Sequence, residues 1–403
     1  MKNLYTLIFA LFSITFFSQT VTTLAGSVNG GYQDGFGSNA LMREPFGICS
    51  DNNGNLFFTD SNNWKIRKML ISTGEVTTFA GSTSGFLDGI GLTSKFNSPF
   101  GICSDNNGNL YVSDLGSSNI RKIVIATGLV STVAGSGSGL QDGTVITAKF
   151  NKPCGLSIDA SGNNLYVADF DNYRIRKIDL VTGIVSTFAN LSDRPQGVCL
   201  DLSNIYVATG NGAVLKIPIN TGVVTVIAQV PPNASGICIY NGYLYVSTLL
   251  TIRQINISSA STSILAGTTG ASGSADGIGT NATFRYVWGL CVAGNEIYVV
   301  EDANNLIRKV TIPLQNLSTT QQIELSNKTL IYPNPNNGKF TVNSNNELVN
   351  QVKIYSLDGK LIFAQNTNTV NPEISLESIS KGIYLATITL ENGLETKSKI
   401  IIK

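Results

Sequence analysis

The chain has 403 residues, of which 42% are hydrophobic and 13% charged, with 27 Lys and Arg against 26 Asp and Glu. This balance leaves no basic excess to hold a phosphate backbone, so we do not expect nucleic-acid binding. Histidine is absent. Its absence excludes His-based acid–base catalysis, Ser-His-Asp and Cys-His nucleophilic arrangements and His metal sites.

Residues 1–20 have the pattern of a secretory signal peptide. Lys2 supplies the positive start, Leu4–Phe17 the apolar core, and Ser18-Gln19-Thr20 a small-x-small exit within which the cleavage position is not fixed. The alternative is a buried strand. The apolar run is too short to span a bilayer stably, and no later stretch reaches ~20 apolar residues, so no transmembrane segment is expected.

After this segment the same sequence pattern begins six times. The copies start at Val21, Val76, Val130, Val185, Val224 and Thr262, which by subtraction gives spacings of 55, 54, 55, 39 and 38 residues. A period of roughly 40–50 residues with four strand-like runs is typical of β-propeller blades. Gly is abundant, as turn-rich all-β chains require.

Within the first blade, apolar and polar residues alternate with period two. The predicted strands are Phe46–Asp51, Leu56–Asp60, Lys65–Ile71 and Glu75–Ala80. Six first strands are counted along the chain, but only five of them are followed by a fourth strand. Val21–Ala25 precedes the first blade and supplies the missing strand. The sequence therefore predicts an all-β fold, a six-bladed β-propeller closed by its N-terminal strand.

The repeat resembles the NHL-repeat family over about residues 21–313. The third blade carries the clearest motifs: Pro153 and Gly155, Asn164–Asp169, and Arg174–Ile178. The fourth and fifth blades depart from the family pattern and have Thr209 and Thr248 where the family has Asp. The resemblance implies the propeller fold, while any function carried by those positions would be lost in these two blades.

Six cysteines occur in a chain that we expect to be exported. Five of them, Cys49, Cys103, Cys199, Cys238 and Cys291, occupy one blade position, where the third blade has Ser157; Cys154 lies three residues before that serine. Equivalent positions on neighbouring blades are too far apart for a disulfide. We therefore predict reduced thiols packed between blades. A ring of metal-binding thiolates is the alternative.

The C-terminal region departs from the repeat. Residues 314–328 read as a polar linker, and residues 329–403 contain several short alternating strands that predict a small Ig-like β-sandwich. The motifs Tyr332-Pro333-Asn334-Pro335, Asp358-Gly359 and Gly382-Ile383-Tyr384 resemble the type A sorting domain of the type IX secretion system. This resemblance implies contact with that machinery and a final location outside a Gram-negative cell, released or attached to its surface after removal of the domain. An ordinary adhesion module is the alternative.

The first strands indicate where a ligand would bind. Residues just before the first-strand Gly should surround the channel mouth, on the face that also carries the four long loops 27–45, 82–98, 136–152 and 268–286. Three of these residues, Trp288, Phe46 and Phe100, form an aromatic arc, and Gln196 belongs to the same ring. Aromatic faces at a concave mouth suit sugar rings or peptide side chains. Support for the long loops is the alternative role.

Charged residues also recur once per blade. Second strands end in Asp60, Asp114, Asp169 or Glu301 in four blades, which could bind Ca²⁺ but more commonly would cap turns. The Asp-Gly pairs of the long loops lack EF-hand spacing, and we interpret them as tight turns. The Arg-Lys pairs, such as Arg67-Lys68, are expected to be solvated or ion-paired between blades.

These observations favour a non-catalytic binding protein without a cofactor. Its ligand would be an extracellular carbohydrate or protein that the sequence does not identify. Two alternatives remain open, a Ca²⁺-dependent enzyme of the propeller lactonase or lyase type and a purely structural surface protein.

Overall fold

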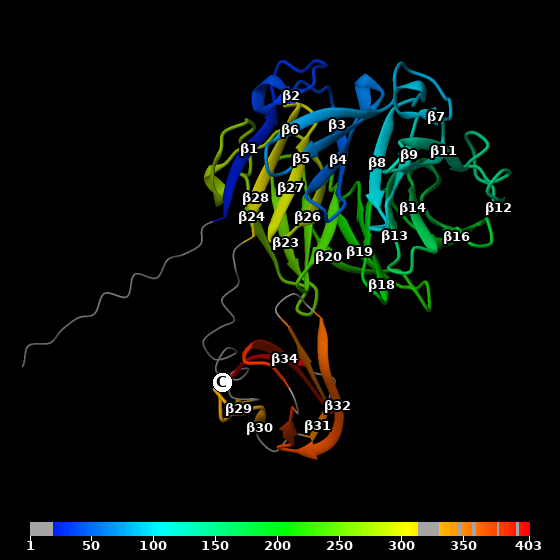
Figure 1. Cartoon of the computed structure of the whole chain (residues 1–403). Helices are drawn as coiled ribbons and strands as arrows, with labels where there is room; N and C mark the ends of the chain where they lie inside the picture. Colours follow the sequence, from blue (N-terminus) through cyan, green and yellow to red (C-terminus); the bar gives the residue numbers. More distant parts are fainter. Residues whose placement is uncertain (1–18, 313–329, 345–347, 357–359, 377–378, 392–394) are drawn as a thin grey trace, which may run out of the picture. The chain divides into compact units, whose positions relative to one another are not determined.

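The computed structural model describes residues 19–312, 330–344, 348–356, 360–376, 379–391 and 395–403 (Figure 1). The chain divides into two compact units, with the boundary between Pro313 and Leu314. Most of the predicted signal peptide and the whole of the predicted linker, residues 314–328, lie outside the described residues; Thr20, the last residue of the predicted signal peptide, begins β1. Among the residues that are described, no helix is long and apolar enough to cross a membrane.

Residues 19–312 form six antiparallel sheets, here called sheets one to six in the chain order of their first strands. Each begins with three strands that follow one another in the chain. Sheet one contains β3 (Pro45–Ser50), β4 (Asn55–Asp60), β5 (Lys65–Leu70) and β6 (Glu75–Ala80). Sheet two contains β8 (Pro99–Ser104), β9 (Asn109–Asp114), β10 (Asn119–Val124) and β11 (Leu129–Ala134). Sheet three contains β13 (Pro153–Ile158), β14 (Asn164–Asp169), β15 (Arg174–Asp179) and β16 (Ile184–Asn190).

The other three sheets repeat this order. Sheet four contains β17 (Pro195–Leu200), β18 (Asn204–Thr209), β19 (Ala213–Pro218) and β20 (Thr225–Gln229). Sheet five contains β21 (Ile237–Tyr240), β22 (Tyr243–Ser247), β23 (Ile252–Asn256) and β24 (Thr262–Ala266). Sheet six contains β26 (Val287–Ala293), β27 (Glu296–Glu301) and β28 (Leu306–Thr311), and its fourth strand is β1 (Thr20–Gly26) from the start of the unit. Figure 1 shows β1 in dark blue beside the yellow β28.

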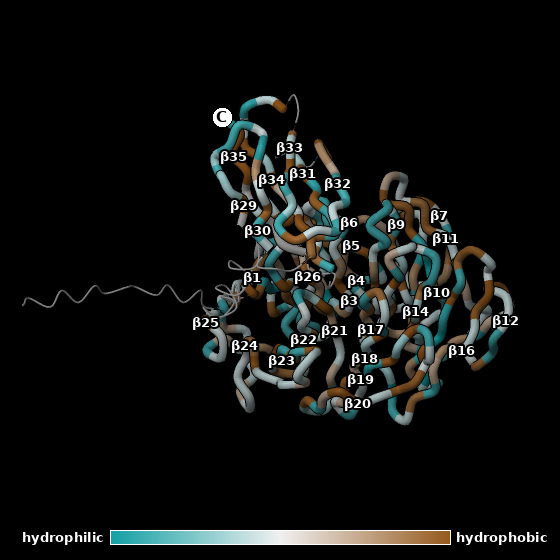
Figure 2. Tube along the Cα trace, turned by 90° about the horizontal axis from the view of Figure 1, so that it is seen from below, coloured by the Kyte–Doolittle hydropathy of each residue, from teal (hydrophilic) through white to brown (hydrophobic). Residues whose placement is uncertain are grey.

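Turn chemistry and hydropathy explain why these segments form hairpins. In the first turn of sheet one, the Asp51 carboxylate accepts hydrogen bonds from the backbone N–H groups of Asn53 and Asn55, at 2.8 and 3.1 Å. Asn52 adopts a φ of 57°, which Asn tolerates better than most residues. Apolar stretches, brown in Figure 2, recur along the strands on either side of such turns. Their side chains form the clusters between neighbouring sheets.

The pairing of β1 with β28 agrees with the strand predicted at Val21–Ala25. The pairing is antiparallel, with Val21 opposite Val310 and Thr22 opposite Lys309. Val21 is fully buried in a cluster that also contains Val310 and Phe284. The start of the unit thus supplies the outer part of its last sheet.

The six first strands contact one another in a cycle, β3–β8–β13–β17–β21–β26 and back to β3. Each carries a Gly that permits this close approach, except that in sheet five the Gly, Gly236, immediately precedes β21. A Cβ added to Gly47 would lie 2.4 Å from the Phe100 carbonyl oxygen of the next sheet, and one added to Gly289 would lie 2.4 Å from the Phe46 oxygen. Any larger residue would force the first strands apart. This packing gives the unit a propeller-like arrangement.

Each of the four long loops adds a two-residue strand to the outer edge of the sheet that it enters. These are β2 (Gly35–Phe36), β7 (Gly89–Ile90), β12 (Gly143–Thr144) and β25 (Gly277–Ile278), which pair with β6, β11, β16 and β1. Short 3₁₀ helices follow some loop strands or precede third strands: η1 (Gly37–Asn39), η2 (Ser61–Asn63), η3 (Gly91–Thr93), η4 (Phe170–Asn172) and η5 (Gly279–Asn281). Sheets four and five receive no such strand from residues 19–312.

The six cysteines all lie within residues 19–312 and form no disulfide with one another. Burial raises the pKa of the Cys291 thiol to about 12 and raises the pKa of the other five as well. The thiols are therefore protonated at neutral pH and behave as small apolar groups.

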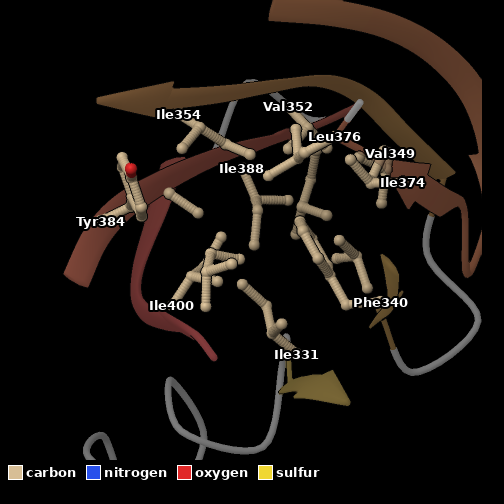
Figure 3. Close-up of a cluster of buried hydrophobic side chains, with 14 residues drawn as sticks. Ile331, Phe340, Val349, Val352, Ile354, Ile374, Leu376, Tyr384, Ile388 and Ile400 are labelled. Atoms are coloured by element: carbon tan, nitrogen blue, oxygen red, sulfur yellow. The ribbon is translucent and has the colours of Figure 1, made fainter. Parts of the chain in front are cut away.

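The second unit is a pair of sheets. One contains β29 (Leu330–Tyr332), β30 (Lys339–Asn343) and β33 (Glu373–Ser375), and the other contains β31 (Leu348–Tyr355), β32 (Leu361–Val370), β34 (Gly382–Leu390) and β35 (Glu395–Ile402). Apolar side chains from both sheets, among them Phe340, Val352 and Ile388, point toward one another in Figure 3. The motif Asp358-Gly359 lies outside the described residues, but the strands on either side of it, β31 and β32, pair with each other in antiparallel fashion.

Candidate functional site

The three aromatic residues predicted at the channel mouth lie together. The rings of Phe46 and Phe100 stack with centroids 4.5 Å apart and an interplanar angle of 20°. Trp288 meets both of them edge-on, at 5.3 and 5.4 Å. Each ring is half-buried. Because β26, β3 and β8 are neighbours in the cycle of first strands, residues from distant parts of the chain form one aromatic cluster.

Gln196 occupies the equivalent position in sheet four and lines the same cavity as the aromatic cluster. Its side chain is buried, and its amide oxygen accepts no hydrogen bond from the described residues. A buried amide oxygen without a donor is costly, so it marks a place where a ligand donor would be stabilised. The remaining members of this ring are Ser235, whose hydroxyl lies 2.9 Å from the Val287 carbonyl oxygen, and Cys154.

The cavity bounded by these residues has a volume of about 80 Å³ and is lined by all six first strands. Pockets that enclose a small organic ligand commonly measure ~300–1,000 Å³. The channel therefore has room for a few water molecules only. A ligand at this site would rest on the exposed parts of Phe46, Phe100 and Trp288 and would not enter the channel.

Asp302, whose carboxylate lies beside Trp288, was not among the predicted site residues. Burial raises the pKa of Asp302 to about 6, and a hydrogen bond from the Trp288 side chain opposes this rise only in part. One of its carboxylate oxygens has no hydrogen-bond partner among the described residues. The signal for Asp302 was a break in the repeat, because the corresponding positions hold Ser61, Leu115 and Phe170 in the first three sheets.

The repeated basic pairs were expected to be solvated or ion-paired between blades. Their arginines are instead buried, and each is ion-paired with its own sheet and the loop that enters it. Arg67, Arg121, Arg176 and Arg308 have side chains that are 0% exposed. Each binds two acidic groups of its own sheet and loop, and we call this arrangement the arginine clamp. In sheet one, Arg67 lies 2.7 Å from Asp60 on β4 and 2.8 Å from Asp34 in the entering loop.

The loop Asp of each Asp-Gly pair is part of this clamp, and its role exceeds that of a turn residue. Asp34 also accepts hydrogen bonds from the backbone N–H and the hydroxyl of Thr78 on β6, at 3.1 and 2.8 Å. Asp88, Asp142 and Asp276 make the same contacts in sheets two, three and six. Each clamp thereby fixes a long loop to the outer edge of its sheet, away from the mouth.

The second-strand acids cap backbone N–H groups, as expected, but these groups belong to the entering loop. Asp60 accepts a hydrogen bond from the N–H of Arg43 at 2.8 Å, and Glu301 accepts one from that of Arg285 at 2.8 Å. Over the described residues, no group of three or more Cys, Asp or Glu side chains is arranged to hold a metal ion.

Two families match parts of the chain. Residues 330–403 match the secretion system C-terminal sorting domain, and residues 150–178 match the NHL repeat. A 144-residue segment is 33% identical to NHL repeat-containing protein 2 of Bos taurus, covering 33% of this chain and 20% of that protein. The chain thus spans about a fifth of the length of this relative.

Solved structures resemble the chain in fold. A structural genomics protein of unknown function from Bacteroides thetaiotaomicron matches with a TM-score of 0.60 at 19% identity, covering 73% of this chain and 76% of the other. An auxiliary nutrient binding protein from the same organism matches with a TM-score of 0.55 at 13% identity, covering 72% and 76%. At these identities the likeness concerns the fold alone.

Proposed function

We propose that this protein is an exported six-bladed β-propeller that binds a carbohydrate or protein ligand without catalysing a reaction. The six sheets would be the blades, with β1 closing the ring, and residues 21–313 would form the propeller. The cycle of contacts among the six first strands and the pairing of β1 with β28 support this arrangement. A closed ring also leaves no sheet open at the junction between the first and the last blade.

The observation that carries the binding proposal is the aromatic cluster at the mouth. Phe46, Phe100 and Trp288 are half-buried and preorganised against one another, so a ligand would meet rings that lose little conformational freedom. Gln196 and Asp302 would supply hydrogen bonds beside the rings. Stacking on a sugar ring or on an apolar peptide side chain is the interaction that such a surface favours.

Arrays of glycans and peptides probed with the purified protein would test this function. For a ligand found in this way, Trp288→Ala and Phe100→Ala should each weaken binding by ~2 kcal/mol or more, as expected for an aromatic anchor. Melting temperatures of the variants would control for folding. If both variants bind as tightly as the parent while Asn107→Ala, in a hairpin turn after β8, loses binding, the functional surface lies elsewhere.

Export would proceed through the type IX secretion system. The match of residues 330–403 to the sorting-domain family supports this route. Residues 329–403 would contact the secretion machinery, and the propeller would end outside the cell or on its surface once the signal peptide and the sorting domain are removed. A chain ending at residue 328 should accumulate in the periplasm. Normal amounts of that truncated chain in the medium or on the surface would contradict the assignment.

A further inference from the structure

Sheet five keeps the arginine of the clamp but lacks its acidic partners. Arg253 lies opposite Ile264, just as Arg67 lies opposite Thr78 in sheet one. The second-strand acid is replaced by Thr248, whose hydroxyl is hydrogen-bonded to the hydroxyl of Thr251 at an O–O distance of 2.8 Å. The loop that enters sheet five contains no Asp-Gly pair. Among the described residues, the side chain of Arg253 forms no hydrogen bond or ion pair, and its buried Nε has no partner.

The exposure of this arginine differs from that of its counterparts. The four clamp arginines are fully buried beneath their loops, whereas Arg253 is only half-buried. Sheet four offers a further contrast, because Leu215 occupies the equivalent position there and is buried. Sheet five has thus kept a guanidinium at a position where this fold also accepts an apolar side chain.

The outer edge of sheet five is uncovered as well. In sheets one, two, three and six, the loop strand covers a fully buried valine of the outer strand: Val76, Val130, Val185 or Val21. Thr262 occupies the equivalent place on β24 and is exposed. An edge strand presents unpaired N–H and C=O groups, to which an extended peptide can add as a further strand.

We propose that this edge binds, in trans, an extended peptide segment of another protein that carries an Asp-Gly pair. The Asp would bind the guanidinium of Arg253 and the backbone N–H of Ile264, as Asp34 binds Arg67 and Thr78 within the chain. The residues after it would pair alongside Thr262 and Ser261, the counterparts of Val76 and Glu75.

The chain's own loops give the chemistry of this partner. Four times, an Asp followed by Gly places its carboxylate on a clamp arginine at 2.6–2.8 Å and then adds two residues to the neighbouring edge. These four segments are already held by their own sheets, so a second copy of the chain has none of them free to donate. The fifth Asp-Gly pair of the sequence, Asp358-Gly359, belongs to the region that we propose is removed after export. On that proposed function, the segment would come from a different protein.

A labelled peptide copying residues 31–42 provides the test, with binding to the full chain measured by fluorescence anisotropy. We expect saturable binding that falls at least about tenfold when Asp34 of the peptide is changed to Ala, since hydrogen bonds to charged groups contribute that much or more. The variant Arg253→Leu should cause a similar loss. Leu215 of sheet four shows that leucine fits this position, and a melting curve checks the fold.

Further peptides test separately the two interactions of the proposed site, the ion pair with Arg253 and the strand pairing with β24. A peptide with proline at both Gly35 and Phe36 keeps the carboxylate but cannot donate to a strand ladder, so it should also bind more weakly. Absence of saturable binding by the parent chain up to about 1 mM peptide, or equal binding by Arg253→Leu, would overturn the proposal. Displacement of the peptide by glucuronate at the same concentration would show a carboxylate site without peptide recognition, which also overturns it.

Discussion

The substitution Val21→Ala tests whether the N-terminal strand β1 packs into sheet six. Val21 is 0% exposed on β1 and packs with Val310 and Phe284 in the cluster of sheet six. The change removes two methyl groups at ~0.8 kcal/mol each and leaves a cavity, so the unfolding free energy should fall by about 2 kcal/mol. For a domain of this size the melting temperature should fall by about 4 °C.

Val28→Ala is the matched control, because Val28 follows the same strand and is 56% exposed. It should change the unfolding free energy by less than about 0.5 kcal/mol. Differential scanning calorimetry would give both melting temperatures. Hydrogen exchange adds a local measurement, since Leu306–Thr311 should exchange faster in Val21→Ala as its pairing with β1 loosens.

Equal melting temperatures for the two variants would refute the reasoning. Val21 would then lie in an unpacked N-terminal segment, and sheet six would end at β28. Deleting residues 21–25 would extend the test, because the deletion also removes Thr23, which donates hydrogen bonds to Asp276 at 2.9 and 3.0 Å. The clamp on Arg308 would lose one of its supports, so this deletion should cost far more than the single substitution.

Three further predictions follow from buried groups. Arg121→Leu should lower the unfolding free energy by about 3–5 kcal/mol in denaturant titrations, because Asp114 stays buried without its partner, whereas Lys122→Ala should cost under about 1 kcal/mol. Native thiols should react slowly with iodoacetamide at pH 8, since burial raises their pKa, and all six should titrate after denaturation without reductant; fewer would indicate a disulfide. Burial raises the folded-state pKa of Asp302 to about 6, so the protein loses stability as pH rises through that value. The variant Asp302→Asn should therefore raise the unfolding free energy by about 1 kcal/mol at pH 8, after allowance for solvent screening. Near pH 4, where Asp302 is protonated, the same variant should leave the unfolding free energy unchanged. An equal effect of Asp302→Asn at both pH values would contradict this assignment.

Strand positions were predictable because period-two alternation and turn residues recur in every copy. The predicted strand Glu75–Ala80 coincides with β6, and the predicted Val21–Ala25 lies within β1. The pairing of β1 with β28 was also predictable, since a count of first and fourth strands leaves one extra strand at the start of the repeats and one strand missing at their end. These inferences depend only on local chemistry and on repetition, which the sequence displays directly.

The burial of the arginines was not predictable from charge pattern alone. Arg67 lies two residues after the start of its strand, and one of its partners, Asp34, precedes it by 33 residues in a loop without periodicity. Charged residues are seldom fully buried, so an exposed position was the more probable interpretation. Only the folded loop brings the carboxylate, the guanidinium and the hydroxyl of Thr78 together.

The sequence predicts which residues surround the mouth of the channel but not how their side chains are arranged. The repeat register places Phe46, Phe100, Gln196 and Trp288 at equivalent positions, and the structure lines one cavity with all four. The stacking of Phe46 on Phe100 depends on side-chain rotamers and on the closeness of β3 to β8, which register does not specify. Asp302 lies off the motif and was therefore overlooked.

In a repeat protein, residues shared by all copies are explained by the structure that the copies share. The first-strand glycines recur in all six copies and the clamp arginines in four, and each has a packing or ion-pair role in its own sheet. A binding function should therefore depend on positions where the copies differ. Trp288 and Asp302 are such positions, and Arg253 keeps the repeated arginine where its acidic partners are missing. Each presents a ring, a carboxylate or a guanidinium that its own sheet does not fully use. The differences between the repeats, more than the repeat itself, indicate where partners of this protein would bind.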